Sequence, residues 1–329
     1  MTEPLLVVED LAVEFTTEDG IAKALDGVTF EINAGETVAI VGESGSGKSV
    51  TALSVLGLLR QPPARIVRGS VRLRGQELLG MSPKRLREIR GKDAAMIFQD
   101  PMTALNPVHR VGSQIAENIR LHSDLGKKAA FARAIGLLEL VGVAQPATRA
   151  RQYPHEFSGG MRQRAMIAMA IANDPSLLIA DEPTTALDVT IQAQVLGLLR
   201  TAQQETGAAT VLITHDLGVV AEMAERVLVM YAGRIVEQAD VRSLFRSPRH
   251  PYTVGLLDSI PRLDVEAQSL TPIPGSPPSL LAPPPGCPFA PRCALRKGRS
   301  RCVEERPALA PVGSGRASAC HFSEELVHV

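Results

Sequence analysis

Residues 42–49 are Gly42-Glu43-Ser44-Gly45-Ser46-Gly47-Lys48-Ser49 and fit the pattern G-x-x-x-x-G-K-[ST]. Glycines let the backbone wrap closely, so that N–H groups can point inward at phosphate oxygens. A helix that follows presents its positive end to the same anion. Lys48 is placed to reach the β- and γ-phosphates, and the Ser49 hydroxyl to ligate Mg²⁺. This stretch, called the phosphate loop below, therefore predicts a nucleotide site rather than a Gly-rich surface turn.

The segments on both sides of the loop support this interpretation. A short apolar strand is expected over 37–41 and a helix over 49–59, which is the context that such a loop needs. Further along the chain, the pattern predicts a strand at 177–180, a helix at 191–204 and a strand at 210–214. Alternating strands and helices predict an α/β fold with a mostly parallel central sheet, here a P-loop core.

Two carboxylates follow the second buried strand. The run Leu177-Leu178-Ile179-Ala180 is followed by Asp181 and Glu182. Ligands of parallel sheets bind at this carboxyl end of the strands. We expect Asp181 to hold Mg²⁺, directly or through water, and Glu182 to polarise the attacking water as a general base.

Two regions depart from the alternating pattern. Between Gln99 and Phe157, helices are expected over 111–121 and 129–141 with no strand between them, so residues 100–157 are interpreted as a helical insertion. The composition changes again after residue 247, and Pro is dense enough over 271–291 to forbid helix or central strand. We therefore expect a core over 1–247 and a Pro- and Cys-rich C-terminal extension over 248–329.

The composition limits the class of protein. Hydrophobic residues make up 45% and charged residues 21%, which is typical of a globular chain. Acidic and basic residues balance at 35 each and aromatic residues reach only 3%, so nucleic acid is not the expected partner. No apolar run reaches the roughly 20 residues that span a bilayer, and the acidic start is unlike a signal peptide. A cytoplasmic location is expected.

A Ser-Gly-Gly turn narrows the family. Phe157-Ser158-Gly159-Gly160-Met161 resembles the signature motif of ABC ATPases, with Phe and Met replacing the usual Leu and Gln. A hydroxyl and free N–H groups at a helix start can bind an anion. The resemblance implies that Ser158, Gly159 and Gly160 serve the γ-phosphate of ATP bound to the opposite subunit.

Other elements of the same family follow in order. Gln99 resembles the Q-loop glutamine, which implies contact with the γ-phosphate, Mg²⁺ and a membrane subunit. Ala186-Leu187-Asp188 resembles the D-loop, and His215 resembles the switch histidine at the γ-phosphate. Phe15 is either the aromatic residue that stacks on adenine or a buried core residue.

A closer resemblance is to the ATPases of oligopeptide, dipeptide and nickel importers. It is carried by ESGSGKS, by FQDPMTALNP from Phe98, by ADEPTTALDVTIQAQ, by His250-Pro251-Tyr252-Thr253 and by PGCPFAPRC in the extension. The resemblance implies ATP hydrolysis at the cytoplasmic face of the membrane. It also implies two permease subunits, an extracytoplasmic binding protein and usually a second, paralogous ATPase. Peptide is the expected cargo, with nickel or another small solute open.

Two other functions fit the sequence less well. ABC ATPases that act on nucleic acid carry long coiled coils, large zinc-bearing inserts or two cassettes, whereas this chain has one cassette and no heptad run between Lys48 and Ser158. A regulatory role without hydrolysis conflicts with the complete set of Lys48, Asp181, Glu182 and His215. Both functions are therefore less favoured than an import ATPase.

All four cysteines, Cys287, Cys293, Cys302 and Cys320, lie in the loop-rich extension. Disulfides are rare in the cytoplasm and a tail with little core needs a crosslink, so a four-thiolate metal site is the economical interpretation. The spacings are not the paired C-x-x-C of common zinc ribbons, and the resemblance implies a [4Fe–4S] cluster. Zinc or an unmetallated tail are the alternatives. Basic residues nearby could offset the thiolate charge: Arg292, Arg296, Lys297, Arg299 and Arg301.

Overall fold

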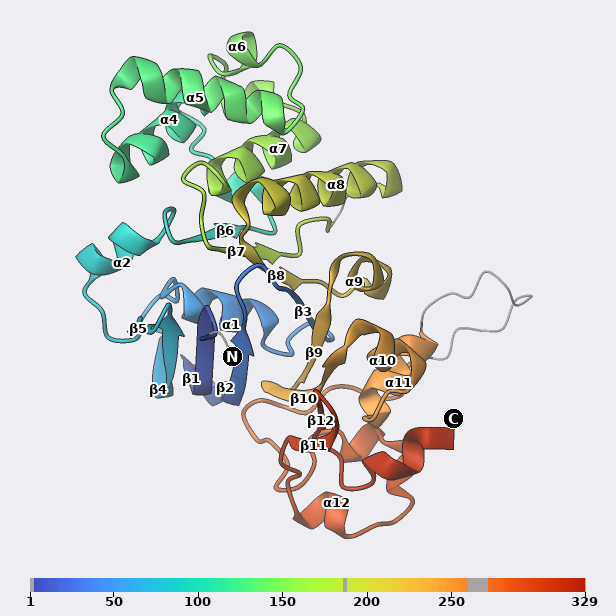
Figure 1. Ribbon diagram of the computed structural model, residues 1–329. Coiled ribbons are helices and arrows are strands. Elements are labelled where there is room, and N and C mark those ends of the chain that lie inside the picture. The colour runs from blue at the N-terminus through green and yellow to red at the C-terminus, as the bar shows by residue number, and fades with distance from the viewer. Residues whose placement is uncertain (1–2, 186–187, 260–271, 329) are drawn as a thin grey trace. The chain divides into compact units, whose positions relative to one another are not determined.

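The computed structural model describes residues 3–185, 188–259 and 272–328 (Figure 1). The chain forms two compact units. Unit 1 comprises residues 1–5, 32–37 and 80–213, and unit 2 comprises residues 6–31, 38–79 and 214–329. Each unit is defined by its internal packing and consists of several separate segments of the chain. The division into a core over 1–247 and an extension over 248–329 remains a prediction.

Unit 1 combines three parallel strands with a group of helices. Its elements are α2 (Pro83–Ile89), β6 (Ala94–Ile97), α3 (Pro101–Ala104), α4 (Val111–His122), α5 (Lys127–Leu140), α6 (Pro146–Arg149), the 3-10 helix η1 (Pro154–Glu156), α7 (Gly159–Ala170), β7 (Leu177–Asp181), α8 (Val189–Thr206) and β8 (Ala209–Ile213). β7 pairs in parallel with β6 on one side and β8 on the other. Every residue of β7 and β8 is buried, as expected for strands that are covered on both faces.

The segment between β6 and β7 is helical, as the sequence predicts for 100–157. Buried residues recur at helical spacing: Ile115 and Ile119 on α4, and Ala130, Ala134 and Leu138 on α5. These stripes let α4 and α5 pack against each other and against α7 (Figure 1). The helix expected over 191–204 is α8, which begins at its cap Asp188 and ends at Gly207 with a φ of 64°.

Unit 2 contains an antiparallel sheet that the sequence reading did not anticipate. Its strands run in the order β2-β1-β4-β5, with bounds β1 (Leu6–Thr17), β2 (Gly20–Ile32), β4 (Ala64–Leu73) and β5 (Gln76–Glu77). A register shift follows Glu9, where Asp10 has a φ of 44°. This bulge interrupts the two-residue alternation of β1, so the period-2 signal that identifies a half-buried strand is weakened.

The other strands of unit 2 run in the order β11-β12-β10-β9-β3. β3 (Thr37–Val41) is parallel to β9 (Arg226–Tyr231), whereas β10 (Arg234–Asp240), β12 (Arg316–Ser318) and β11 (Ala310–Gly313) join antiparallel. The helices of this unit are α1 (Lys48–Val55), α9 (Leu217–Met223), α10 (Val241–Arg246), α11 (Pro251–Asp258), η2 (Ala290–Arg292), η3 (Ala294–Arg296), α12 (Arg301–Glu304) and η4 (Ser323–His328). Helix α1 ends before the expected residue 59, because Gly57 adopts a φ of 61°.

Residues beyond 247 share the hydrophobic core of unit 2. Tyr252, Phe289 and Ala319 are buried in one cluster with Val41 and Val229. Of the stretch 271–291, residues 272–289 form neither helix nor strand, as expected, but the 3-10 helix η2 begins inside it at Ala290. Residues 260–271 lie outside the described part of the chain. The extension is therefore packed onto the same core that supports the phosphate loop.

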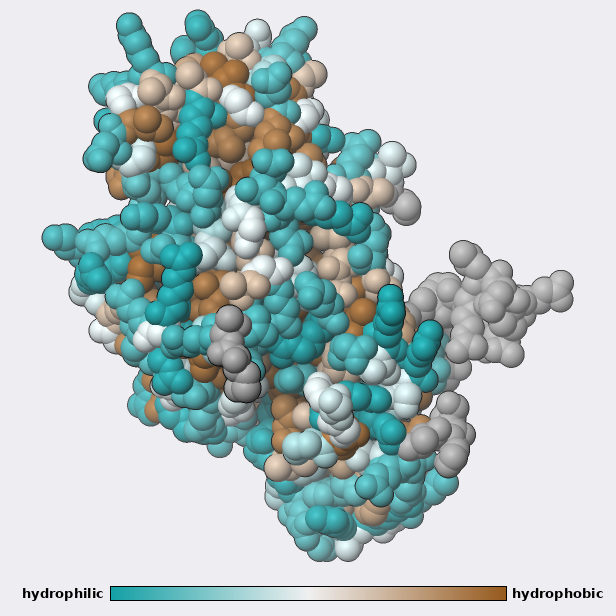
Figure 2. Space-filling model, viewed as in Figure 1, coloured by the Kyte–Doolittle hydropathy of each residue, from teal (hydrophilic) through white to brown (hydrophobic). Residues whose placement is uncertain are grey.

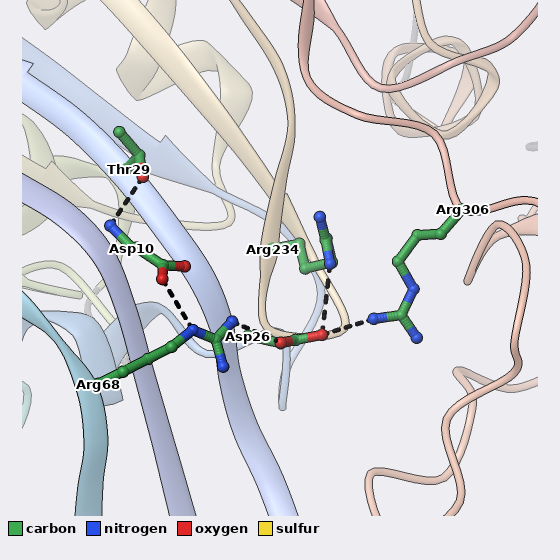
Figure 3. A network of polar contacts seen from close by, with 6 residues as sticks. All are labelled: Asp10, Asp26, Thr29, Arg68, Arg234 and Arg306. Atoms are coloured by element: carbon green, nitrogen blue, oxygen red, sulfur yellow. Dashed lines mark hydrogen bonds and ion pairs between the residues drawn. The ribbon is translucent and has the colours of Figure 1, made fainter.

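An ionic network also joins the extension to the antiparallel sheet. Asp26 of β2 accepts hydrogen bonds from Arg68 at 3.1 Å, Arg234 at 3.3 Å and Arg306 at 2.6 Å. Figure 3 shows Asp26 between Arg68 on one side and Arg234 and Arg306 on the other. Arg68 also donates to Asp10, at the bulge of β1. One carboxylate thus fixes residues from β4, the start of β10 and the extension.

Candidate nucleotide site and four-cysteine pocket

The glycines of the phosphate loop are required by the chain around them. Gly42 follows β3 with a φ of 153°, and a Cβ placed on it would lie 2.2 Å from the carbonyl oxygen of Met230. Gly47 begins α1 with a φ of 106°, and a Cβ there would lie 2.7 Å from a methyl carbon of Leu25. Real Cβ atoms do not come so close to other atoms, and positive φ values strain other residue types. At positions 42 and 47 the backbone path is therefore available only to glycine.

Lys48 is buried inside the phosphate loop and binds its backbone. Its ammonium group donates to the carbonyl oxygens of Gly42 at 2.8 Å and Glu43 at 3.0 Å, and the residue is 5% exposed. The hydroxyl of Ser46 is buried and has no hydrogen-bond partner among the described residues. A buried polar atom of this kind is normally satisfied by a ligand or water. Lysine, free hydroxyl and helix start together fit the binding of a phosphate group.

The carboxylates expected to act on water and metal belong to unit 1. Asp181 is the last residue of β7 and is 6% exposed. Glu182 follows with a φ of 46°, a strained backbone for this residue type. Its carboxylate accepts hydrogen bonds from Gln99 at 3.1 Å and from the Thr185 hydroxyl at 2.7 Å. The structure thus brings together Gln99 and Glu182, two residues that the sequence singled out separately.

The Ser158 turn begins helix α7. The Ser158 hydroxyl accepts a hydrogen bond from the N–H of Met161 at 3.3 Å, the usual contact of a helix cap. A Cβ on Gly159 would meet no described atom within 4 Å, and one on Gly160 would meet only Ile191, at 3.9 Å. Further along α7, the Gln163 side chain donates to the Pro183 carbonyl at 2.9 Å, which ties this helix to the segment after Glu182. Neither glycine is needed for the packing of this chain.

The remaining predicted nucleotide residues occupy exposed or partly exposed positions. His215 is exposed between β8 and α9, and Phe15 is half-buried on β1 opposite Ala64 of β4. Phe15 is therefore not one of the fully buried core residues. Asp188 caps α8 by accepting the N–H of Ile191 at 3.0 Å. Ala186 and Leu187 of the expected D-loop lie outside the described residues.

The four cysteines line one pocket of unit 2. Cys287, Cys293, Cys302 and Cys320 all face it as free thiols, together with aromatic and histidine side chains of the extension. The N–H of Cys287 donates to the carbonyl of Cys302 at 2.9 Å, which holds the first and third cysteines side by side. Residues far apart in the extension are thus brought to one cavity.

The pocket favours the neutral form of three of the four thiols. Burial raises the pKa of Cys287 and of Cys293, and raises the pKa of Cys320 to about 12. A metal centre would have to displace these protons, which makes its binding dependent on pH. Among the described residues no group of three His, Cys, Asp or Glu side chains is arranged to hold a metal ion. Four thiol donors suit zinc or an iron–sulfur cluster chemically, and the geometry of the pocket does not choose between them.

One basic residue expected near the thiolates has a different partner. The sequence placed Arg292 among the cations that offset a thiolate centre. The structure instead pairs its guanidinium with Glu43 of the phosphate loop, at 2.7 and 2.9 Å. Because that contact joins residues 249 positions apart, no local pattern could reveal it.

Comparison with known proteins agrees with this geometry. A family model described as "ABC transporter" matches residues 25–185, and one described as "Oligopeptide/dipeptide transporter, C-terminal region" matches residues 236–302. The "Dipeptide transport ATP-binding protein DppD" of Bacillus subtilis is 54% identical over 294 residues, covering 89% of this chain and 88% of the relative. The chain belongs to the ATP-binding proteins of peptide ABC transporters. The "Oligopeptide transport ATP-binding protein OppD" of Mycobacterium tuberculosis is 57% identical over 98% of this chain, which spans about half (52%) of that relative.

Solved structures support the ABC ATPase fold. The ATP-binding cassette MJ0796, in a dimeric post-hydrolysis state bound to ADP and Pi, matches with a TM-score of 0.65 and 26% identity, over 72% of this chain and 99% of that one. The fold is thus the P-loop α/β cassette that the sequence predicts. Within the described residues, no helix combines the length and apolar character needed to cross a membrane.

Some contacts of this peptide-transporter cassette were missed by sequence reasoning. Thr185 holds Glu182, and Tyr252 accepts the backbone N–H of Glu43 at 2.7 Å. Thr185 and Tyr252 did stand in stretches that carried the family resemblance, ADEPTT and His250-Pro251-Tyr252-Thr253. Nothing in those stretches indicated which side chain each residue would contact.

Proposed function

We propose that this chain binds and hydrolyses ATP as the motor subunit of an ABC importer for peptides. The observation that carries the proposal is the fixed carboxylate of Glu182. It follows a buried strand, has a strained backbone, and is held by Gln99 and Thr185. A carboxylate held in this way can orient a water molecule and accept its proton.

The other groups take the roles that their chemistry suits. Lys48 binds the β- and γ-phosphates, and Ser49, Gln99 and Asp181 supply oxygen ligands for Mg²⁺. His215 contacts the γ-phosphate and Phe15 stacks on adenine. These assignments rest on family membership and on the local geometry of each residue within its own unit.

Replacing Glu182 tests the catalytic assignment. Glu182→Gln should leave the ATP dissociation constant within about threefold while turnover falls by about 10²- to 10⁴-fold, because the base is lost and the nucleotide contacts remain. Glu205→Gln, at the end of α8, is the matched control and should change neither quantity. Near-normal turnover of Glu182→Gln would refute the assignment.

We also propose that the chain works in a head-to-tail pair, with a paralogous ATPase subunit as its partner. The open space at Gly159 supports this proposal, because the chain itself does not require glycine there. A partner's nucleotide phosphate would require it, since a close approach to free N–H groups needs the absence of a side chain. Sedimentation of the Glu182→Gln variant with MgATP, alone and with the candidate partner, measures such pairing directly.

Two permease subunits and an extracytoplasmic binding protein complete the proposed importer, which places this chain at the cytoplasmic face of the membrane. Five of the eight exposed large hydrophobic residues described lie in 100–157: Met102, Val108, Leu121, Leu125 and Leu140. Figure 2 shows brown side chains among the teal ones in the α4–α5 region. This concentration of exposed apolar residues in one segment supports an interaction surface there, one that receives a permease helix.

Crosslinking tests the permease surface. Val108→Cys, at a side chain 72% exposed, should crosslink to a permease subunit in the intact complex. Ile21→Cys, 55% exposed in the other unit, is the matched control and should not. Equal crosslinking at both positions would remove the support for this surface.

The cargo follows from the relatives. Their printed names specify oligopeptide or dipeptide transport. Peptide is therefore the proposed substrate, with nickel or another small solute as the second candidate, because this subunit does not itself bind the cargo. Binding of peptides and of Ni²⁺ to the cognate extracytoplasmic protein would decide between them.

The four-cysteine pocket is proposed to hold a [4Fe–4S] cluster, with zinc as the alternative. Four thiols that line one cavity support a metal centre, and the family resemblance of the extension favours the cluster over zinc. Such a centre would link distant parts of a tail that has few regular elements. Anaerobic purification followed by metal analysis tests this: about four irons with acid-labile sulfide support the cluster, one zinc without colour supports the alternative, and neither metal in a folded chain refutes both.

A further inference from the structure

The extension reaches the phosphate loop through one arginine. The guanidinium of Arg292 donates to both carboxylate oxygens of Glu43, at 2.7 and 2.9 Å. The Arg292 side chain is 4% exposed and that of Glu43 is 29% exposed. A two-pronged pair largely removed from solvent is stronger and more directional than an exposed ion pair.

The position of this guanidinium is itself fixed. Arg292 also donates to the carbonyl of Pro274 at 2.9 Å, and more weakly to the carbonyl of Ile273 at 3.3 Å and the hydroxyl of Tyr231 at 3.4 Å. It lies 5.9 Å from the ring centre of Phe289. Because so many contacts hold the group, its place opposite Glu43 is preset by the fold.

Tyr252 holds the same loop residue by its backbone. The hydroxyl of Tyr252 accepts the N–H of Glu43 at 2.7 Å, and the ring is fully buried against Tyr231, with centres 4.6 Å apart. Lys48 donates to the carbonyl oxygen of Glu43. The side chain, N–H and carbonyl of one loop residue are therefore all held, two of them by residues beyond position 247.

The pair also changes the charge of the loop. A carboxylate in a phosphate loop would repel the nucleotide phosphates if it were left uncompensated. Arg292 neutralises Glu43 and leaves the loop available to an anion. We propose that Arg292 and Tyr252 are positioning residues of the nucleotide site, so that the four-cysteine extension is a working part of that site. This inference rests on the proposed binding of ATP.

Nucleotide affinity of the full chain tests the inference. Arg292→Ala should weaken ADP binding by about tenfold or more, since a buried charged hydrogen bond is lost and an uncompensated carboxylate remains. The matched control is Arg306→Ala, which removes another arginine of the extension, one that binds Asp26 rather than a side chain of the phosphate loop. Its ADP affinity should stay within about twofold of wild type. Calorimetric titration gives the affinities, with melting temperature and metal content recorded for each variant.

A double variant separates charge from folding. Glu43→Ala combined with Arg292→Ala removes the uncompensated carboxylate, so it should bind ADP more tightly than Arg292→Ala alone, by about threefold or more. Tyr252→Phe keeps the buried ring but removes the acceptor of the Glu43 N–H, and should weaken ADP binding by about threefold.

The outcomes are distinct. Equal weakening by Arg292→Ala and Arg306→Ala, or no recovery in the double variant, would overturn this inference while leaving ATP binding intact. A wild-type chain that binds no nucleotide would overturn both this inference and the proposed function. Selective weakening by Arg292→Ala with recovery in the double variant would establish the positioning role.

Discussion

The phosphate loop and the Ser158 turn both place glycine beside a helix start, yet their surroundings differ. At Gly42, a Cβ would lie 2.2 Å from a backbone oxygen, and the loop is held by Lys48, Tyr252 and Arg292. At Gly159, a Cβ would meet no described atom within 4 Å, and the contact of the turn is an ordinary helix cap. The packing of this chain requires glycine at position 42, whereas it does not require glycine at position 159.

This difference separates two kinds of anion site. A loop whose shape is fixed by its own chain can bind phosphate before any partner arrives, because the cost of ordering it is met during folding. Under the proposed pairing, a turn with open glycines would be completed by a molecule outside the chain. Changes at the phosphate loop should therefore affect the isolated chain, and changes at the Ser158 turn should affect only the assembled pair.

The largest expected effect is at the turn. Ser158→Arg should reduce hydrolysis by the assembled pair by about 10³-fold or more at the composite site, because a long side chain fills the space that a partner's γ-phosphate needs. ATP binding by the isolated chain should stay unchanged, and its stability should fall only by the lost Ser158 helix cap, about 1 kcal/mol. Turnover of the reconstituted pair is the measurement, with Gln204→Arg at the exposed end of α8 as control. Loss of ATP binding by isolated Ser158→Arg would show that the turn also serves the nucleotide of its own chain.

Gly42→Ala should have the next largest effect, on the isolated chain. The new methyl group would overlap the Met230 carbonyl, so we expect a loss of about 3 kcal/mol or more in the free energy of unfolding, together with loss of nucleotide binding. Gly45→Ala is the matched control, since it also has a positive φ of 77° but meets no described atom within 4 Å. It should cost only about 1 to 2 kcal/mol of backbone strain. Denaturant unfolding checks both, and equal losses would show that the close approach is unimportant.

Asp26→Asn tests whether any weakening of unit 2 disturbs the loop. Burial opposes the ionisation of Asp26, but the hydrogen bond from Arg68 and the charges of Arg234 and Arg306 outweigh it and lower its pKa. We expect the variant to lose about 1 to 2 kcal/mol of stability at pH 7 with unchanged ADP affinity. A lowered carboxylate pKa stabilises the fold above the ordinary value of 3.8 and loses that effect as pH falls through the folded value.

The difference in melting temperature between wild type and Asp26→Asn should therefore be constant from about pH 8 to pH 5 and shrink below about pH 4. Glu9→Gln, which breaks the exposed pair with Arg72, is the control and should change the melting temperature little. A marked fall in ADP affinity for Asp26→Asn would mean that the loop responds to the whole of unit 2 rather than to its own contacts.

The local parts of this molecule were accessible from sequence. The strand at 37–41, the loop at Gly42, the strand before Asp181 and helix α8 each depend on short-range patterns of burial, glycine and capping. The antiparallel sheet was missed because the bulge at Asp10 breaks the alternation of β1. The contacts of Arg292 and Tyr252 with Glu43 were missed because they join residues more than 200 positions apart. Sequence patterns identify which functional side chains are present, whereas long-range packing decides which residues each side chain contacts.

Gly159→Ala should have the smallest effect on stability, and it tests most directly whether the Ser158 turn serves a partner rather than this chain. Gly159 begins α7, its φ is not positive, and a Cβ would meet no described atom within 4 Å. Alanine is the better helix former, so the isolated chain should be unchanged or more stable by up to about 1 kcal/mol, with normal ATP affinity. Hydrolysis by the assembled pair should nevertheless fall, because the methyl group lies where a partner's phosphate would approach the free N–H groups. Gly197→Ala, in the middle of α8 and equally open, is the control that should raise stability without lowering turnover.

A destabilised Gly159→Ala chain would show that the glycine serves this chain after all, and full turnover of the pair would show that the turn binds no phosphate.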